Sequence, residues 1–274
     1  RRFLDCTLGL GGHSAALLAA GAAVVGIDRD PQARARACER LEAAGDRLEV
    51  RSGTFAAAAR DCAARGERFH GVLADLGVSS LQLDDHARGF SIRSQSALDL
   101  RMGDGCAEDA LALIDRLDRG SLARLLRELG EEPNAGRVAS AILRARAAGR
   151  LATAADLAGV VRSAVRGSFG RHPAMRTFQA LRIAVNGELD ELDELLALLP
   201  KLLLPGGMAV IISFHSLEDR RVKESFRAGL TAGTWQAAAK RVVTAELDEL
   251  ARNPRAQAAK LRWARRPERG EDQP

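Results

Sequence analysis

Short apolar runs alternate with helical patterns along the first eighty residues, and this alternation limits the possible folds more than any other feature. The expected strands are rich in apolar and β-branched residues and cover residues 3–6, 23–27, 48–51 and 71–76. Helical spacing of apolar residues fills the segments between them. Because strands that alternate with helices form parallel sheets, we predict an α/β fold.

After residue 76 the alternation stops, and residues 77–106 show no period. Long loops without secondary structure are usually functional in compact domains, so we assign this stretch to the active site. Four helical segments follow, to about residue 166, and then one long helix is expected over residues 174–199. An apolar run at residues 208–213 resumes the sheet, and two β-like stretches, near residues 240–244 and 259–264, form an antiparallel hairpin at its end.

A glycine-rich turn follows the first expected strand, and an aspartate ends the second. The turn reads Gly9-Leu10-Gly11-Gly12-His13-Ser14, and the aspartate is Asp28. Glycines let the backbone approach a ligand closely, and a carboxylate at the second strand's end can accept hydrogen bonds from ribose hydroxyls. This pairing predicts an adenosine-containing cofactor. The alternative is a tight turn without a ligand, with Asp28 capping the next helix.

Two common nucleotide sites are disfavoured by the same stretch. The dinucleotide fingerprint G-x-G-x-x-G requires a third glycine where Ser14 stands, and no G-x-x-x-x-G-K-[ST] occurs. An adenosine ligand without pyrophosphate remains, and S-adenosylmethionine is the candidate. Asp75 ends the fourth expected strand, beside Gly77, and is placed to meet the reacting end of that cofactor.

Nine ordered stretches along the chain form recognisable motifs. They are D-C-T-L-G-L-G-G-H-S from Asp5, D-R-D-P from Asp28, D-L-G-V-S-S from Asp75, R-G-F-S from Arg88, L-D-L-R-M from Leu98, G-E-E from Gly130, F-Q-A-L-R-I-A-V-N-G-E-L from Phe178, F-H-S-L-E-D-R from Phe214 and N-P-R from Asn253. Through these motifs the chain resembles the bacterial small-subunit (16S) ribosomal RNA cytosine-N4 methyltransferases along nearly its whole length. Leu81, Leu100 and Gln257 depart from the family's usual residues, which are proline, methionine and arginine. Members also carry an apolar, histidine-containing stretch before the first strand, which this sequence lacks.

The resemblance implies a Rossmann-like, S-adenosylmethionine-dependent methyltransferase sheet with an inserted helical domain. The expected division is residues 1–104 and 173–274 for the methyltransferase domain and residues 105–172 for the insert. The reaction implied is methylation of the exocyclic amine of a decoding-region cytosine. Carried over by motif, the cofactor contacts fall on Gly11, Gly12, His13, Asp28, Phe55, Asp75 and Gln82.

The same motifs provide candidate residues for catalysis and for RNA binding. We expect an acceptor at the end of the fourth strand, Asp75 or a group of the Ser79 and Ser80 loop, to hydrogen-bond an amino proton while the nitrogen attacks the methyl group. The target cytosine must be unpaired or flipped. Stacking, phosphate contact and shaping of the cytosine pocket are expected of Arg88, Phe90, Arg101, Phe214, His215 and Asp219, although core packing explains the two phenylalanines equally well.

Charge, cysteine content and hydropathy indicate which partners, metal sites and cellular location to expect. The net charge of +5 is concentrated in residues 220–274, which contain 13 Lys and Arg but only 7 Asp and Glu. This cluster of positive charge is an indication of nucleic acid binding. The four cysteines form no C-x-x-C pair near histidines, so we expect neither a zinc site nor disulfides, and no other metal is assigned. No apolar run reaches membrane length and no signal peptide is evident, which favours the cytoplasm.

Three alternatives to the methylation of ribosomal RNA remain. Amino-methyltransferases of DNA or free nucleotides commonly carry a proline-rich tetrapeptide ending in an aromatic residue after the fourth strand, where this chain has Asp75-Leu76-Gly77-Val78. A non-catalytic RNA-binding assembly factor would not bind S-adenosylmethionine, and a nicotinamide oxidoreductase would require the third glycine. The expected partner is small-subunit ribosomal RNA or the assembled small subunit; the sequence leaves open which of the two, the target position and the oligomeric state.

Overall fold

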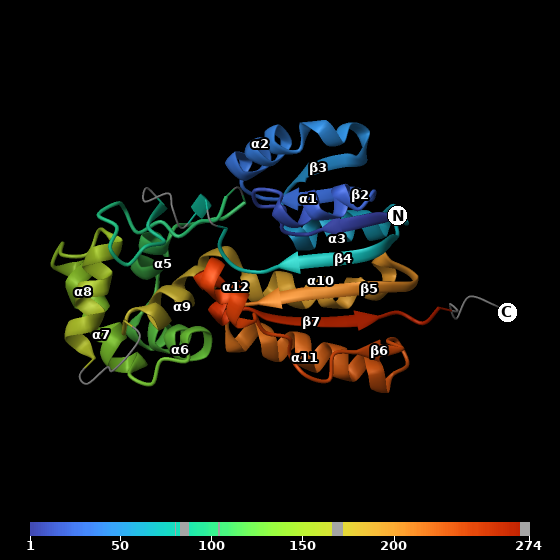
Figure 1. Cartoon of the computed structure of the whole chain (residues 1–274). Helices are drawn as coiled ribbons and strands as arrows, with labels where there is room; N and C mark the ends of the chain where they lie inside the picture. The colour runs from blue at the N-terminus through green and yellow to red at the C-terminus, as the bar shows by residue number, and fades with distance from the viewer. Residues whose placement is uncertain (80, 83–87, 104, 166–171, 269–274) are drawn as a thin grey trace. The chain divides into compact units, whose positions relative to one another are not determined.

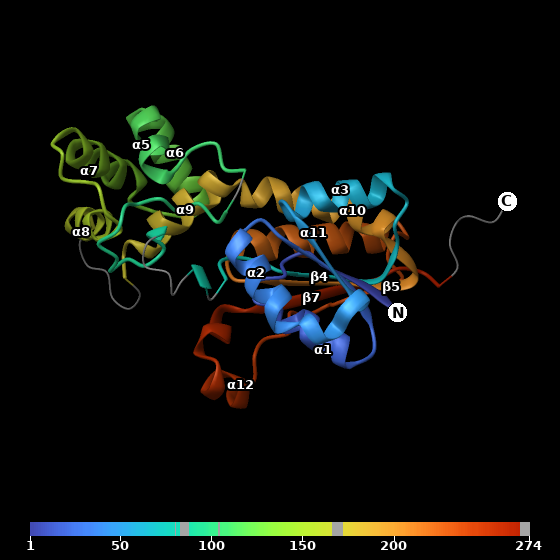
Figure 2. The same cartoon turned by 90° about the horizontal axis from the view of Figure 1, so that it is seen from above.

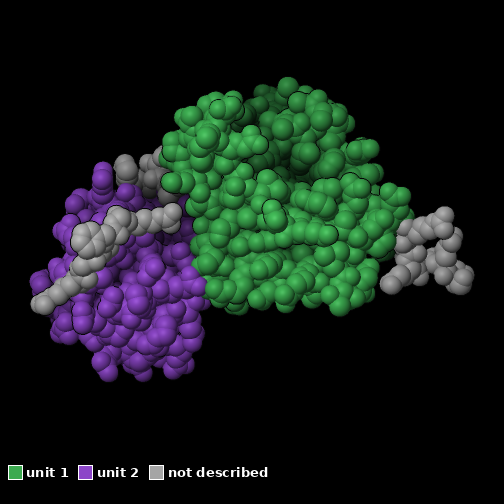
Figure 3. Space-filling model, turned by 60° about the horizontal axis from the view of Figure 1, so that its bottom comes forward, with its two compact units in different colours: residues 1–77, 189–274 green, residues 78–188 purple. Residues whose placement is uncertain are grey.

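The computed structural model describes residues 1–79, 81–82, 88–103, 105–165 and 172–268, and the chain divides into two compact units. The first unit consists of residues 1–77 and 189–274, and the second of residues 78–188, as Figure 3 shows in green and purple. The limits expected for the inserted domain, residues 105 and 172, both lie inside the second unit.

The first unit is built on a seven-stranded sheet (Figure 1). Its strands are β1 (Arg2–Asp5), β2 (Ala23–Asp28), β3 (Leu48–Ser52), β4 (Phe69–Asp75), β5 (Leu203–Ser213), β6 (Ala237–Ala238) and β7 (Lys260–Arg265). The strand order is β3-β2-β1-β4-β5-β7-β6, and β1 to β5 pair in parallel. β7 runs antiparallel to both β5 and β6. The predicted α/β fold is therefore confirmed.

Helices cover both faces of this sheet (Figure 2). One face carries α1 (Gly12–Ala19) and α2 (Pro31–Arg40), and the other carries α3 (Phe55–Ala64), α10 (Glu188–Leu202) and α11 (Ser216–Thr231). The starts of these helices follow from sequence: the Asp30 carboxylate accepts the Gln32 amide (3.0 Å) before α2, and the Thr54 hydroxyl accepts the Ala57 amide (3.2 Å) before α3. The remaining short helices of the unit are η1 (Glu42–Arg47), α12 (Leu247–Arg252) and η3 (Pro254–Ala258).

The strand order brings three strand ends together. β1 pairs with β2 on one side and with β4 on the other, although β2 and β3 separate β1 from β4 along the chain. The order therefore reverses between β1 and β4, and in open α/β sheets ligands bind outside the carboxyl ends of the strands at such a point. Asp5, Asp28 and Asp75 are the last residues of β1, β2 and β4.

The second unit is helical. Its helices are α5 (Ala110–Arg116), α6 (Arg119–Gly130), α7 (Ala135–Ala147), α8 (Ala154–Ala164) and α9 (Met175–Asn186), around a core that includes Leu98, Leu122, Ile142, Leu157 and Leu181. The four helical segments expected before residue 166 are confirmed. In the part of the chain that the structure describes, none of the helices has both the length and the apolar character of a membrane span.

Two expectations for the elements beyond residue 172 were wrong. The single helix expected over residues 174–199 is broken, because Gly187 adopts a left-handed conformation (φ 63°) that ends α9, and α10 begins at the next residue. The strand expected near residues 240–244 is reduced to one bridge between Val243 and Leu261. The hairpin partner of β7 is instead the short β6.

Gly130 lets α6 and α9 approach closely in the second unit. A β carbon at this position would lie 2.5 Å from the Arg176 carbonyl oxygen and 3.1 Å from the Ala180 β carbon. Because a backbone atom cannot move aside cheaply, we expect Gly130→Ala to lower the free energy of unfolding by about 1–3 kcal/mol. Chemical denaturation followed by circular dichroism measures this change.

Gly136→Ala is the matched control, because Gly136 lies in the first turn of α7 and a β carbon there would meet no atom within 4 Å. Alanine should be neutral there or stabilise the protein by up to about 1 kcal/mol. Equal midpoints for the two variants would show that the α6–α9 contact is not tight at Gly130.

Candidate active site

The backbone that follows β1 is hydrogen-bonded to the end of β2. The Leu8 amide donates to the Ile27 carbonyl (2.8 Å), and the Gly9 amide donates to Oδ2 of Asp28 (2.8 Å). The glycine turn and the second strand's carboxylate therefore lie together, as the sequence predicted for an adenosine site.

Gly11 and Gly12 complete this turn and open α1. Gly11 has a φ of 76°, a left-handed conformation that strains any other residue, and a β carbon there would also lie 2.7 Å from Cδ1 of Leu41. A β carbon at Gly12 would meet no atom within 4 Å. No side-chain cap comes from Gly11. Because the first amides of a helix lack intrahelical partners, this turn offers donors to a bound carboxylate or hydroxyl.

The Asp28 carboxylate is held from two sides and keeps acceptor capacity. Its Oδ2 accepts the Gly9 amide and its Oδ1 accepts the Asp30 amide, each at 2.8 Å. A carboxylate oxygen can accept a second hydrogen bond, so both can also receive a hydroxyl of a bound ribose. Burial raises the pKa of Asp28 above its ordinary value, although the amides of Asp30 and Gly9 oppose the shift.

Asp5 and Ser14 fix the glycine turn at both of its ends, and sequence reasoning missed them. Asp5 is completely buried, and its carboxylate accepts the Ser14 hydroxyl (2.6 Å) and the Thr7 amide (3.2 Å). Burial raises the pKa of Asp5, with the hydrogen bonds from Ser14 and Thr7 opposing it. The available signal was a carboxylate at the end of the first strand with hydroxyl residues on both sides of the turn.

Of the three aspartates at the strand ends, Asp5, Asp28 and Asp75, the Asp75 carboxylate has the fewest hydrogen-bond partners among the described residues. Its amide donates to Oγ1 of Thr7 (2.7 Å), and its Oδ2 lies 3.4 Å from Nε2 of His13. Its Oδ1 is buried and has no hydrogen-bond partner among the described residues. Because buried polar atoms are normally paired, this oxygen is the atom of the site most in need of a donor from a ligand.

His13 is predicted to make stability depend on pH. Its hydrogen bond to Asp75 raises the pKa of His13, with partial burial opposing the shift. The folded state thus holds the proton more tightly than the unfolded state, so the stabilisation is fully present below about pH 6.5 and is lost as pH rises through the raised pKa. We expect the melting temperatures of wild type and His13→Gln to differ more at pH 6 than at pH 9.

The expected difference is small, because the His13 side chain is 47% exposed and solvent screens the pair. It should shrink further in 0.5 M salt at pH 6. A difference between the two proteins that grows toward alkaline pH would contradict this role of His13.

The turn that follows β5 lies beside the turn that follows β4. β4 and β5 pair with Asp75 opposite Ile212, and a β carbon at Gly77 would lie 3.6 Å from Cδ2 of Phe214. The Phe214 ring therefore packs against the backbone two residues beyond Asp75.

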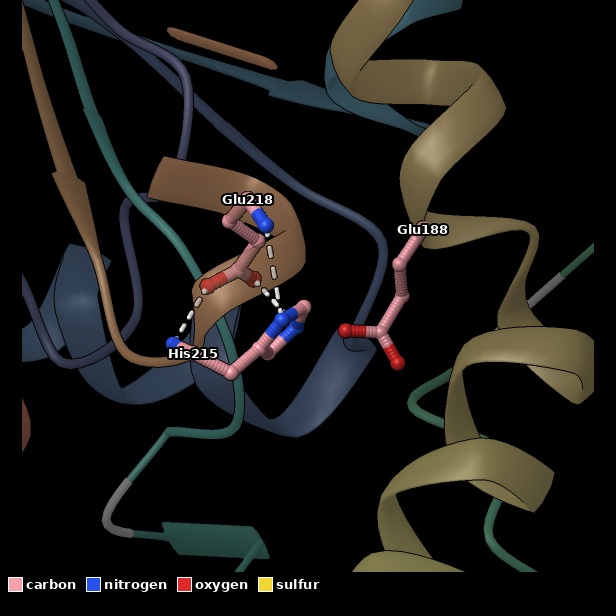
Figure 4. A group of neighbouring side chains, drawn as sticks. All are labelled: Glu188, His215 and Glu218. Carbon is pink, nitrogen blue, oxygen red and sulfur yellow. Dashed lines mark hydrogen bonds and ion pairs between the residues drawn. The ribbon is translucent and has the colours of Figure 1, made fainter. Parts of the chain in front are cut away.

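Glu218 holds the Phe214 turn from the first turn of α11 (Figure 4). Its Oε2 accepts the amides of Phe214 (2.8 Å) and His215 (3.3 Å), while Nδ1 of His215 accepts the Glu218 amide (3.4 Å). This is a capping box in which histidine takes the usual place of serine or threonine. Glu188, also drawn in Figure 4, belongs to the second unit and accepts two hydrogen bonds from Arg182 (2.8 and 2.9 Å).

Asp219 is engaged by basic residues of β7. Nε of Arg262 donates to its Oδ1 (2.7 Å), and Nζ of Lys260 lies 3.8 Å from its Oδ2. Burial alone would raise the pKa of Asp219, but the Arg262 hydrogen bond and the nearby cations outweigh it, so the pKa lies below its ordinary value. The carboxylate thus links α11 to the sheet, and its contact with cytosine stays a prediction.

Several predicted site residues belong to the second unit, and hydrogen bonds or packing within that unit hold their side chains in place. Gln82 is buried, and its amide group joins the Ser79 amide (2.9 Å) to the Met102 carbonyl (2.8 Å). Phe90 packs against the helical core. Arg101 forms two hydrogen bonds of 2.7 Å with Asp99.

The remaining predicted residues are divided between the units. In the second unit, Nη1 of Arg88 donates to the Met102 carbonyl oxygen at 3.5 Å. In the first unit, Phe55 begins α3 and packs, partly buried, against the sheet. Ser80 lies outside the described residues.

The structure thus groups Gly11, Gly12, His13, Asp28 and Asp75 around the ends of β1, β2 and β4, with Phe214 beside the turn after β4.

Comparison with known proteins gives matches along nearly the whole chain. The sequence model of the MraW methylase family matches residues 1–267. Three relatives carry the name ribosomal RNA small subunit methyltransferase H. That of Sorangium cellulosum (strain So ce56) is 50% identical over 268 residues, covering 96% of this chain and 84% of that protein. Those of Koribacter versatilis (strain Ellin345) and Myxococcus xanthus (strain DK1622) are 44% and 47% identical over 281 residues, each covering 96% of this chain and 87% and 90% of those proteins.

Proposed function

The chain belongs to the MraW methylase family, and on that premise we propose that it transfers a methyl group from S-adenosylmethionine to the exocyclic N4 amine of a cytosine in small-subunit ribosomal RNA. The family match confirms the resemblance that the motifs indicate, and the relatives described above are named for the same class of substrate. The observation that supports the chemistry best is the buried, unpartnered Oδ1 of Asp75 at the reversal point of the sheet.

The residues at the ends of β1, β2 and β4 fit S-adenosylmethionine. Asp28 has acceptor capacity for the two ribose hydroxyls, and the glycine turn leaves space and amide donors at the start of α1. Asp75 provides an unsatisfied acceptor on the neighbouring strand end. We assign cofactor binding to Gly11, Gly12, His13, Asp28, Phe55, Asp75 and Gln82.

Cytosine's amino nitrogen is a weak nucleophile, because its lone pair is delocalised into the ring. S-adenosylmethionine supplies an electrophilic methyl group on a sulfonium sulfur. Asp75 accepts a hydrogen bond from one amino proton and so returns electron density to the nitrogen; the alternatives are Ser79, Ser80 or a carbonyl of their loop. Orientation supplies most of the acceleration, and proton acceptance adds about 10²- to 10⁴-fold.

On the RNA side, the target base has to leave any helix before its amine can reach a buried methyl group. Phe214 and Phe90 are the proposed stacking residues, and Arg88 and Arg101 the proposed phosphate contacts, with His215 and Asp219 shaping the cytosine pocket. The partner is the small ribosomal subunit or its RNA, and we place the reaction in the cytoplasm.

Labelled methyl transfer tests this function. Purified protein is incubated with methyl-labelled S-adenosylmethionine and small ribosomal subunits that lack the modification, in parallel with the deproteinised RNA, and the RNA is digested to nucleosides. We expect label in N4-methylcytidine. Label only in DNA or free nucleotides would indicate a different amino-methyltransferase. Absence of both label and calorimetric binding of S-adenosylmethionine would indicate a non-catalytic assembly factor.

A further inference from the structure

The side chain of Thr7 joins the two strands at the reversal point of the sheet. β1 and β4 pair regularly up to Cys6, whose amide donates to the Leu73 carbonyl (2.8 Å). In a regular parallel ladder the Asp75 amide would then donate to the Cys6 carbonyl. It donates instead to Oγ1 of Thr7, at 2.7 Å.

The reason lies in the path of the chain after Thr7. The next two amides, of Leu8 and Gly9, donate to the end of β2, so the backbone turns away from β4 at this residue. An amide left unpaired at a strand end is unfavourable when it is shielded from water, and a threonine hydroxyl is a common substitute for a main-chain acceptor. The Thr7 amide is itself fixed by the carboxylate of Asp5 (3.2 Å).

We propose that Thr7 is a positioning residue for methyl transfer, because its hydroxyl fixes the main chain of Asp75 and through it the unpartnered Oδ1. This inference rests on the proposed function and deepens it. The Gly9 contact with Asp28 does not involve the Thr7 hydroxyl. Loss of the hydroxyl should therefore slow transfer while cofactor affinity is retained.

Thr7→Val preserves the shape of the side chain and removes the acceptor, whereas Thr7→Ser keeps the acceptor. In single turnover with saturating S-adenosylmethionine, we expect Thr7→Val to be slower by about 10- to 100-fold, since small misplacements of reacting groups have effects of this size. Thr7→Ser should stay within about 3-fold of wild type, and the calorimetric Kd of the cofactor should change by less than about 3-fold in both variants. Thr231→Val is the control, because the Thr231 hydroxyl donates to the Arg227 carbonyl at the exposed end of α11.

Amide hydrogen exchange in a peptide covering residues 72–77 reports on the contact without requiring activity. Exchange at Asp75 should accelerate in Thr7→Val but not in Thr7→Ser or Thr231→Val. Should the valine variant fail to fold, Thr7→Ala is judged by the same measurements. Wild-type rates in Thr7→Val, or equal losses in the valine and serine variants, would overturn the role of the hydroxyl. If the wild-type protein transfers no methyl group, the proposed function fails, while hydrogen exchange still decides whether Thr7 holds Asp75.

Discussion

Replacing Asp28 with alanine is expected to weaken the binding of S-adenosylmethionine by about 10²- to 10⁴-fold. Two ribose hydroxyls bound by a carboxylate contribute about 1.5–3 kcal/mol each, and every 1.4 kcal/mol changes the Kd tenfold. The same substitution leaves the Gly9 amide without its acceptor, so the backbone after β1 keeps only the Leu8 amide bond of its two hydrogen bonds to the end of β2. Methyl transfer at ordinary cofactor concentrations should fall in parallel.

Calorimetric titration with S-adenosylmethionine measures this effect, and Asp46→Ala is the matched control. Asp46 lies exposed in η1, so its loss should leave the Kd unchanged. The melting temperature of each variant without ligand shows whether the fold is retained. A folded Asp28→Ala protein with wild-type affinity would exclude Asp28 from the cofactor site.

The strand ends that carry this site could be predicted from sequence because two local rules combine there. Apolar periodicity located β1, β2 and β4 to within about two residues, an error that is ordinary for element boundaries. The rule that ligands bind at the carboxyl ends of parallel strands then selected Asp28 and Asp75. Neither step required knowledge of contacts distant along the chain.

The hydrogen bonds that hold the site could not be predicted in this way, because each depends on a partner far along the chain. Thr7 accepts from an amide 68 residues away, and Asp219 pairs with Arg262, which is 43 residues away. Thr7 and Asp219 both lie in motifs that the family resemblance rests on. The sequence therefore indicates that both residues matter, but it does not show which atoms their side chains contact. The contact of Asp219 with Arg262 could not be foreseen, and its role at the cytosine stays a prediction.

The turn signal Pro205-Gly206-Gly207 falls inside β5, which runs from Leu203 to Ser213. Gly206 has a φ of 73°, and the register passes from Phe69 opposite Leu203 to Gly71 opposite Met208, so β5 is irregular at this point. A β carbon at Gly207 would lie 2.8 Å from the Leu204 carbonyl oxygen and 3.2 Å from those of Phe69 and His70. The turn signal therefore marks an irregularity within the strand, where glycine also permits close contact with β4, and the pairing with β4 on both sides of it could not be predicted from local propensity.

Asp75→Asn is expected to reduce the single-turnover rate of methyl transfer by about 10²- to 10⁴-fold at saturating cofactor, the range found for a lost proton acceptor. Asparagine has nearly the same shape, but it is uncharged and replaces one carboxylate oxygen with an NH₂ donor. The oxygen now buried without a partner would then either become a donor or lose its charge, and neither can accept the amino proton as well.

The comparison of rate with affinity decides which role Asp75 has. If Asp75 is the acceptor, the rate falls while the Kd of S-adenosylmethionine changes by less than about tenfold, because Asp28 still holds the ribose. If Asp75 only holds the cofactor, the Kd rises and saturating cofactor restores the full rate, which would transfer the acceptor role to the Ser79 and Ser80 loop. Asp46→Asn, an exposed replacement of the same kind, should change neither quantity.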